Sequence, residues 1–121
     1  MHDVSIPDQL PGIQVAFALK QCLGKHDLLM TLLKKFWEDY QDTATRLADD
    51  ELGPADVDKL LHDLQGAAVN LGLNELNAAS QRLRDRLKRS GRLIEEDHRQ
   101  FHGELEKISR SIKTLDSALQ S

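Results

Sequence analysis

His62 lies four residues before Gly66 in the stretch "LLHDLQGAAVNLG", residues 60–72, which otherwise has the apolar spacing of an amphipathic helix. Glycine in a helix interior costs roughly 1 kcal/mol relative to alanine. It also removes the one side chain that would crowd the imidazole from the next helical turn. Neutral imidazole is a good nucleophile near pH 7, and a phosphoryl group is a natural group for it to accept.

A helical wheel places His62 away from the apolar side of this stretch. The mean direction of the apolar residues lies roughly 160° from the histidine on an ideal helix. Gly66, Asp58 and Val69 share the side of His62. We therefore expect an exposed imidazole. An idle surface histidine is the alternative, and Gly66 counts against it because exposed helical positions normally favour strong helix formers.

Helices must position this histidine, because apolar residues recur at steps of three and four after Gly12 and no convincing period of two is present. The expected helices span about 13–23, 26–49, 54–71, 74–90 and 93–119. Four long amphipathic helices can hide their apolar stripes against one another. The sequence therefore predicts an all-α fold, an antiparallel four-helix bundle with a short extra N-terminal helix, in a single domain over residues 1–121.

The composition limits the possible partners. A net charge of −4 over 121 residues argues against a general nucleic-acid binder. Cys22 is the only cysteine, so no intramolecular disulfide can form and a reducing compartment is favoured. No apolar run reaches about 18 residues, and the start of the sequence lacks the features of a signal peptide. We expect a cytoplasmic domain with no nucleic-acid partner and no direct membrane insertion.

The segment from His62 to Gly72 resembles the phosphoacceptor motif of histidine-containing phosphotransfer (HPt) domains. That motif runs His-x-Leu-Lys-Gly-small-small, followed by an apolar residue and Gly. The matching residues are His62, Leu64, Gly66, Ala67, Ala68, Leu71 and Gly72. Residues 10–36 also resemble the start of HPt domains at the C-terminal end of hybrid sensor kinases. The resemblance implies a four-helix bundle that carries phosphoryl groups between response-regulator receiver domains of two-component systems.

By this resemblance, His62 would accept a phosphoryl group from the aspartate of a docked receiver and pass it to another receiver. Such a transfer needs in-line placement and charge neutralisation more than covalent machinery. Receivers of that family bring Mg²⁺ and a lysine, so the chain itself would need no cofactor. It also has no room for an ATP-binding kinase domain. We expect a phosphocarrier, not an enzyme that phosphorylates itself from ATP.

Two residues depart from the HPt pattern. Gln65 stands where the family usually has lysine, and a glutamine can give the phosphoryl group only a weaker, neutral hydrogen bond. Arg84 stands where the family often has glutamine or glutamate to steady the imidazole. Our hypothesis is that Arg84 partly supplies the cation missing at Gln65. The alternative is an arginine whose stem packs while its head stays solvated.

A receiver would dock over His62 through a mixed apolar and polar surface. Val69 lies on the same exposed side of the predicted helix, and polar neighbours would set partner choice more than affinity. The expected docking residues are Ile13, Asp58, Lys59, Val69, Asn70 and Leu73.

Two other clusters favour a structural interpretation. Glu95, His98 and His102 have helical spacing that could bind a metal, but a di-iron bundle needs a second Glu-x-x-His motif, which the sequence lacks. His98 also falls in an apolar stripe, so we expect it to pack and we predict no metal site. The basic run at 82–92 lacks aromatic residues for base stacking and is typical of a solvated helix face.

Two functional classes stay open. The first is a phosphorelay intermediate that forms phosphohistidine at His62, and the second is a non-phosphorylated helical adaptor that binds a receiver or another regulator. Gln65 keeps the adaptor open because it removes a cation, whereas Gly66 favours the carrier. The "LPGI" stretch at 10–13 favours the tail of a hybrid sensor kinase, whose parent protein would sit at the inner membrane while this domain faces the cytoplasm.

Overall fold

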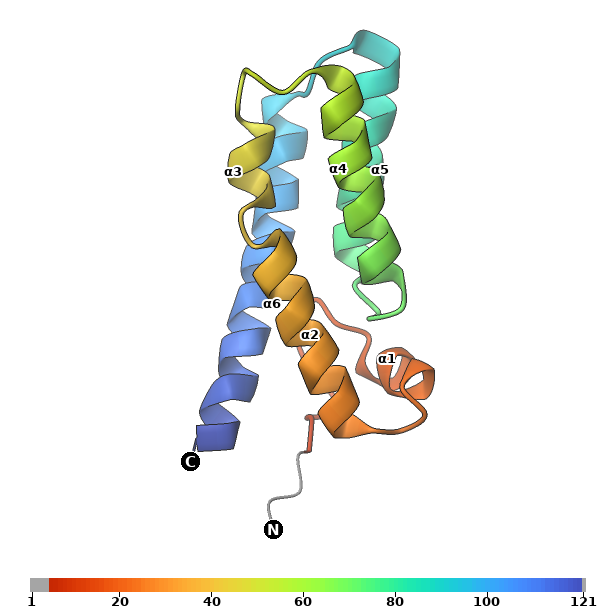
Figure 1. Ribbon diagram of the computed structural model, residues 1–121, viewed down its shortest axis with the longest axis vertical. Coiled ribbons are helices and arrows are strands. Elements are labelled where there is room, and N and C mark those ends of the chain that lie inside the picture. The colour runs from red at the N-terminus through yellow and green to blue at the C-terminus, as the bar shows by residue number, and fades with distance from the viewer. Residues whose placement is uncertain (1–4, 121) are drawn as a thin grey trace.

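The computed structural model describes the backbone of residues 5–120 and the side chains of residues 5–116. Over that range every regular element is a helix, which confirms the all-α prediction (Figure 1). The helices are α1 (Val15–Gln21), α2 (His26–Tyr40), α3 (Thr43–Leu47), α4 (Pro54–Val69), α5 (Asn74–Ser90) and α6 (Glu95–Gln120). None of these helices is both long enough and apolar enough to cross a bilayer.

The helix that carries His62 is held mainly by α5. Helix α4 packs along α5, α5 packs along α6, and α2 and α3 each contact α6, while α2 also touches α4. Helix α1, the start of α2 and the α4–α5 loop lie together at one end of the molecule (Figure 1). The opposite end carries the α3–α4 and α5–α6 connections.

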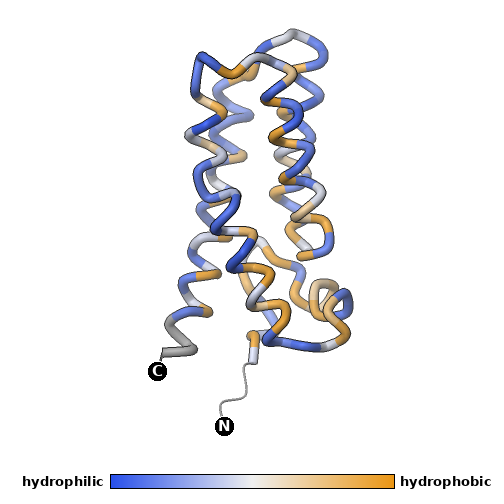
Figure 2. Tube along the Cα trace, in the orientation of Figure 1, coloured by the Kyte–Doolittle hydropathy of each residue, from blue (hydrophilic) through white to orange (hydrophobic). Residues whose placement is uncertain are grey.

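The core between the helices is aliphatic. Apolar positions recur along each long helix and alternate with hydrophilic ones (Figure 2). Burying one such side chain stabilises the fold by about 1.5–3 kcal/mol. The largest fully buried apolar side chains are Leu29, Leu33, Leu61, Leu64, Leu73, Leu76, Leu83, Phe101, Ile108 and Leu115.

The predicted helix over 26–49 is wrong in one respect, because it is divided into α2 and α3. The break falls at Gln41 and Asp42, where the chain makes a turn. Neither glycine nor proline is present there. Asp42 and Thr43 have low helix propensity, since an aspartate side chain competes for backbone hydrogen bonds and a threonine loses rotamer freedom. The turn allows Thr43, Ala44 and Leu47 to be buried.

The predicted first helix over 13–23 is shorter in the structure and spans Val15–Gln21. A turn at Pro11 and Gly12, whose φ is +81°, keeps Ile13 outside the helix. The hydroxyl of Ser111 donates to the carbonyl oxygen of Pro11 at 2.6 Å. The segment before α1 is therefore fastened to α6.

The ends of α4, α5 and α6 follow the sequence prediction to within two residues. Helix α5 spans the predicted 74–90, and Gly91 follows it in the left-handed region with φ +70°. Helix α4 ends at Val69 instead of residue 71, and α6 begins at Glu95 instead of residue 93. The first turn of α6 carries three acidic residues, which the positive end of the helix dipole stabilises.

Gly72, in the α4–α5 loop, lies against Gln14, the residue directly before α1. Its φ is +69°, and a Cβ there would lie 2.7 Å from the carbonyl oxygen of Gln14. The backbone N–H of Gln14 donates to the carbonyl oxygen of Gly72 at 2.8 Å. Only glycine satisfies both the backbone angle and this close approach.

Candidate functional site

His62 lies on the exposed side of α4, as the helical wheel predicts. The residues one turn before and after it, Asp58 and Gly66, share that side of the helix. Within residues 5–116, no hydrogen bond or ion pair involves the His62 ring. The ring is therefore accessible to a group that approaches from outside the molecule.

Gly66 has open space around its α-carbon. Among the atoms that the structure describes, a Cβ built at this position would meet none within 4 Å beyond its two chain neighbours and the backbone of its own helix. Packing within the chain therefore gives no reason for glycine, although glycine in a helix interior costs about 1 kcal/mol relative to alanine. The space beside the His62 ring is left free.

A shallow hollow of about 290 Å³ lies between α2 and α4 next to Gly66. Leu32 of α2 contributes to its wall and is 40% exposed. The hydroxyl of Tyr40, another wall residue, donates to the carbonyl oxygen of Asp63 at 3.3 Å and ties α2 to α4. This hollow is not predictable from the sequence, because its two walls come from α2 and α4 and a helical wheel of one helix does not show how two helices pack.

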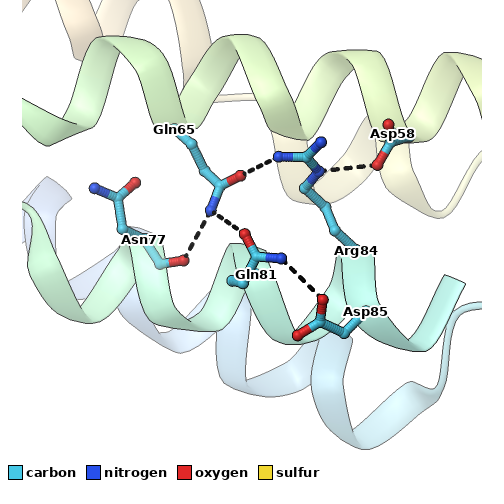
Figure 3. Close-up of polar contacts among 6 residues, drawn as sticks. All are labelled: Asp58, Gln65, Asn77, Gln81, Arg84 and Asp85. Carbon is cyan, nitrogen blue, oxygen red and sulfur yellow. Dashed lines mark hydrogen bonds and ion pairs between the residues drawn. The ribbon is translucent and has the colours of Figure 1, made fainter. Parts of the chain in front are cut away.

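On the opposite flank of α4, Arg84 of α5 reaches back to the helix of His62 (Figure 3). Its Nε donates to Asp58 Oδ1 at 2.9 Å, and its Nη1 donates to Gln65 Oε1 at 2.7 Å. Arg84 therefore bridges α5 to the helix that carries His62. The Arg84 side chain is only 17% exposed, so its guanidinium is not a freely solvated head.

The side chain of Gln65 makes three hydrogen bonds to residues of α5. Beside accepting from Arg84, its amide nitrogen donates to the carbonyl oxygen of Asn77 at 3.3 Å and to Gln81 Oε1 at 3.1 Å. Gln81 in turn donates to Asp85 at 2.9 Å (Figure 3). The Gln65 amide is therefore a fixed link between two helices. Residue spacing could have indicated only the contact between Gln81 and Asp85, which lie one helical turn apart, and not the bonds of Gln65 to α5.

The charges around His62 are arranged in two pairs. Asp58 pairs with Arg84 between the helices, and Lys59 pairs with Asp63 at 3.1 Å along α4. The hydrogen bond from Arg84 holds the pKa of the Asp58 carboxyl below its ordinary value, against the opposing effect of burial, and the nearby His62 adds a small contribution in the same direction. Each pair is close to neutral as a unit.

Four of the six residues predicted to contact a partner lie at the surface, and two are buried. Val69 is 50% exposed, Lys59 and Asn70 are exposed, and Asp58 is partly exposed. Ile13 and Leu73, however, are 6% and 0% exposed, so neither offers a contact to a partner. The turn at 11–12 holds Ile13 against the core, and Leu73 points inward where α5 begins.

In the other candidate clusters, His98 and Arg86 each contact a neighbouring helix. His98 is half-buried, and its Nε2 lies 2.7 Å from the carbonyl oxygen of Ala44, which joins α6 to α3. Among the residues that the structure describes, no three His, Cys, Asp or Glu side chains are grouped as a metal site. Arg86 of the basic run pairs with Asp97 of α6 at 3.2 Å. Burial raises the pKa of the Cys22 thiol.

The chain matches no protein-family model, no curated protein and no solved structure. A functional interpretation of His62 therefore depends on its motif and on the geometry around it.

Proposed function

We propose that this chain is a phosphorelay intermediate of the HPt type, with His62 as its phosphoacceptor. The proposal includes the finer fold: α2 with α3, α4, α5 and α6 as an antiparallel four-helix bundle, and α1 as an additional helix at one end. The single observation that carries it is the exposed ring of His62 beside the open space at Gly66. A helix that served packing alone would have no need of that opening.

In the proposed transfer, a ring nitrogen of His62 attacks the phosphorus of a receiver's aspartyl phosphate. The bond from phosphorus to the carboxylate oxygen breaks, the receiver's aspartate leaves as a carboxylate, and a nitrogen–phosphorus bond forms as the ring loses a proton. A second receiver's aspartate then reverses these steps and takes the phosphoryl group. Presenting an unobstructed ring is the contribution of this chain, since orientation supplies much of the rate in such reactions.

The receiver would dock over the face that contains His62. Val69 and the hollow beside Gly66 supply apolar contact, while Lys59 and Asn70 supply polar contact at the edge. We assign Mg²⁺ and the phosphate-binding lysine to the receiver, and we propose that ATP alone does not phosphorylate this chain. The domain would work in the cytoplasm, either by itself or as part of a hybrid sensor kinase.

A second candidate is a helical adaptor that binds a receiver without accepting phosphate. It is favoured by the engagement of Arg84 and Gln65, both of which are bonded within the α4–α5 network. Both side chains would have to give up a hydrogen bond of this network before they could bind a phosphoryl group. The carrier is the better-supported proposal, because an adaptor gains nothing from the glycine at position 66.

Transfer from a panel of phosphorylated receiver domains distinguishes the two. We expect the wild type to take up label that survives alkali and is lost in acid, as phosphohistidine does. His62→Gln should take up none, whereas His102→Gln, which alters another exposed histidine, should behave like the wild type. Receiver binding without label in the wild type would favour the adaptor instead.

A further inference from the structure

The Asp58–Arg84 pair is the less exposed of the two charge pairs beside His62. The Asp58 and Arg84 side chains are 38% and 17% exposed, against 77% and 49% for Lys59 and Asp63. Gln65 holds the same guanidinium from the other side (Figure 3). A charge pair fixed in a partly desolvated position is screened less by solvent and salt than an exposed one.

Asp58 lies one helical turn before His62, which places the two β-carbons about 5–6 Å apart. In the structure its carboxylate is bonded to Arg84 and not to the His62 ring. Asp58 is therefore not in the arrangement that would orient the imidazole. It acts on the site as a fixed negative charge, and Arg84 acts as a fixed positive one.

We propose that the Asp58–Arg84 pair sets how tightly His62 holds a phosphoryl group: Asp58 weakens the phosphohistidine, Arg84 strengthens it, and the two effects nearly cancel. This inference rests on the proposed function of His62. It makes Arg84 a cation that is shared with Asp58, instead of a free replacement for the lysine missing at position 65. Both are positioning residues, since they act through the field at the site and not by contact with the reacting atoms.

The sign of each effect follows from Coulomb's law. A phosphoryl group adds a charge of about −1.5 to −2 near neutral pH. Asp58 repels this charge from about one helical turn away, and Arg84 attracts it from a similar position, because its Nε lies 2.9 Å from Asp58 Oδ1. Even at the dielectric constant of water, a unit charge at such a distance changes the equilibrium by about fivefold. Cancellation suits a carrier, because a group that is held too tightly is not passed on.

The experiment loads His62 chemically, so that it does not depend on finding the natural receiver. With phosphoramidate as donor, the phosphorus–nitrogen bond of the donor breaks, ammonia leaves, and the phosphoryl group is joined to the ring. Phosphorus NMR measures the equilibrium occupancy in phosphoramidate with added ammonia, and His62→Gln gives the contribution of other histidines. The variants are Asp58→Asn, Arg84→Gln and the double variant. The controls are Arg86→Gln and Asp97→Asn, each of which breaks another Arg–Asp pair, the one between α5 and α6.

We expect the phosphorylation equilibrium constant to rise about fivefold in Asp58→Asn and to fall about fivefold in Arg84→Gln. In the double variant the equilibrium constant should return to within about twofold of the wild-type value. In the controls Arg86→Gln and Asp97→Asn it should also lie within about twofold of that value. Salt near 1 M should shrink both single-variant effects, because it screens charges. A purely structural pair would instead shift both single variants in the same direction, without salt dependence.

Equal occupancy in all variants, or changes of the same sign in Asp58→Asn and Arg84→Gln, would overturn the inference. Neither result touches the proposed function, which receiver transfer tests separately. Conversely, a wild type that no receiver labels would refute the carrier function, while the chemical equilibrium would still report the charges around His62. Urea unfolding of each variant establishes that it is folded under the labelling conditions.

Discussion

The backbone N–H of Gln14 donates to the carbonyl oxygen of Gly72 at 2.8 Å, so the segment before α1 is hydrogen-bonded to the loop that follows the helix of His62. This contact fixes the end of α4 and places α1 beside the α4–α5 loop. Because Gly72 also has a left-handed backbone, the contact depends on a residue without a side chain.

Gly72→Ala should destabilise the protein by about 2 kcal/mol or more. The left-handed backbone alone costs a non-glycine residue roughly 1–2 kcal/mol, and the new Cβ would lie 2.7 Å from the Gln14 carbonyl oxygen. Equilibrium urea unfolding measures the change. A variant as stable as the wild type would show that the loop adjusts freely and that the contact with Gln14 is dispensable.

Gly66→Ala should have the opposite effect on stability and should impair function. A Cβ there meets no neighbour, so the helix gains about 1 kcal/mol of unfolding free energy. The same methyl group narrows the approach to His62, and receiver-dependent labelling should slow. A variant that is both more stable and equally fast in transfer would contradict the role we give to the open space.

The Asp58–Arg84 pair should make part of the stability depend on pH. The pKa of Asp58 is lowered in the folded state from an ordinary 3.8, chiefly by the hydrogen bond from Arg84. Its contribution is therefore fully present above that ordinary value and is lost as the pH falls through the lower, folded-state value. With the carboxylate partly exposed and screened, we expect about 0.5–1 kcal/mol.

The measurement compares the wild type with Asp58→Asn by urea unfolding at several pH values. The difference in unfolding free energy between the two should be present at pH 6 and should shrink in acid as Asp58 is protonated. A difference that persists unchanged into strong acid would assign the effect of the substitution to packing instead of charge.

His98→Ala should lower the unfolding free energy by about 1–3 kcal/mol. It removes the ring that lies 2.7 Å from the Ala44 carbonyl oxygen and leaves that buried backbone group without its partner. His102→Ala, on the exposed side of the same helix, should change stability by no more than about 0.5 kcal/mol. Thermal or urea unfolding of the two variants checks the contrast, and equal losses would contradict it.

Cys22 should be unreactive in the native protein. Its side chain is buried, and burial raises the pKa of the thiol, which reduces the reactive thiolate. Labelling with a chromogenic disulfide reagent should be at least about a hundredfold slower in native buffer than in urea, because it requires local opening. Equally rapid labelling in both solvents would mean that α1 and the following turn open readily.

Helical periodicity predicted the local structure well wherever one amphipathic pattern ran without interruption. The helix over 74–90 and the outward direction of His62 both follow from residue spacing. The break at Asp42 did not, because its cause is a set of modest helix propensities and the burial that a turn permits, with neither proline nor glycine as a signal.

The site was less predictable than the helices, because its details depend on contacts between them. Leu73 was expected to contact a receiver, but the residue directly precedes α5 and is buried there. Gln65 was expected to face a phosphoryl group, whereas three bonds hold it to α5. Spacing along one helix carries no information about which neighbouring side chains will compete for an amide.

The hydrogen bond from Ser111 to Pro11 joins residues that are 100 positions apart in the chain. Closing a loop of this length costs more chain entropy than closing the short connection between α4 and α5. Contacts between residues far apart in the sequence therefore form more slowly than local ones. During folding, the α4–α5 hairpin should therefore form first, and the segment at 5–14 should dock last. The helix pair that carries His62 and its charged neighbours would be assembled before the N-terminal segment closes that end of the molecule.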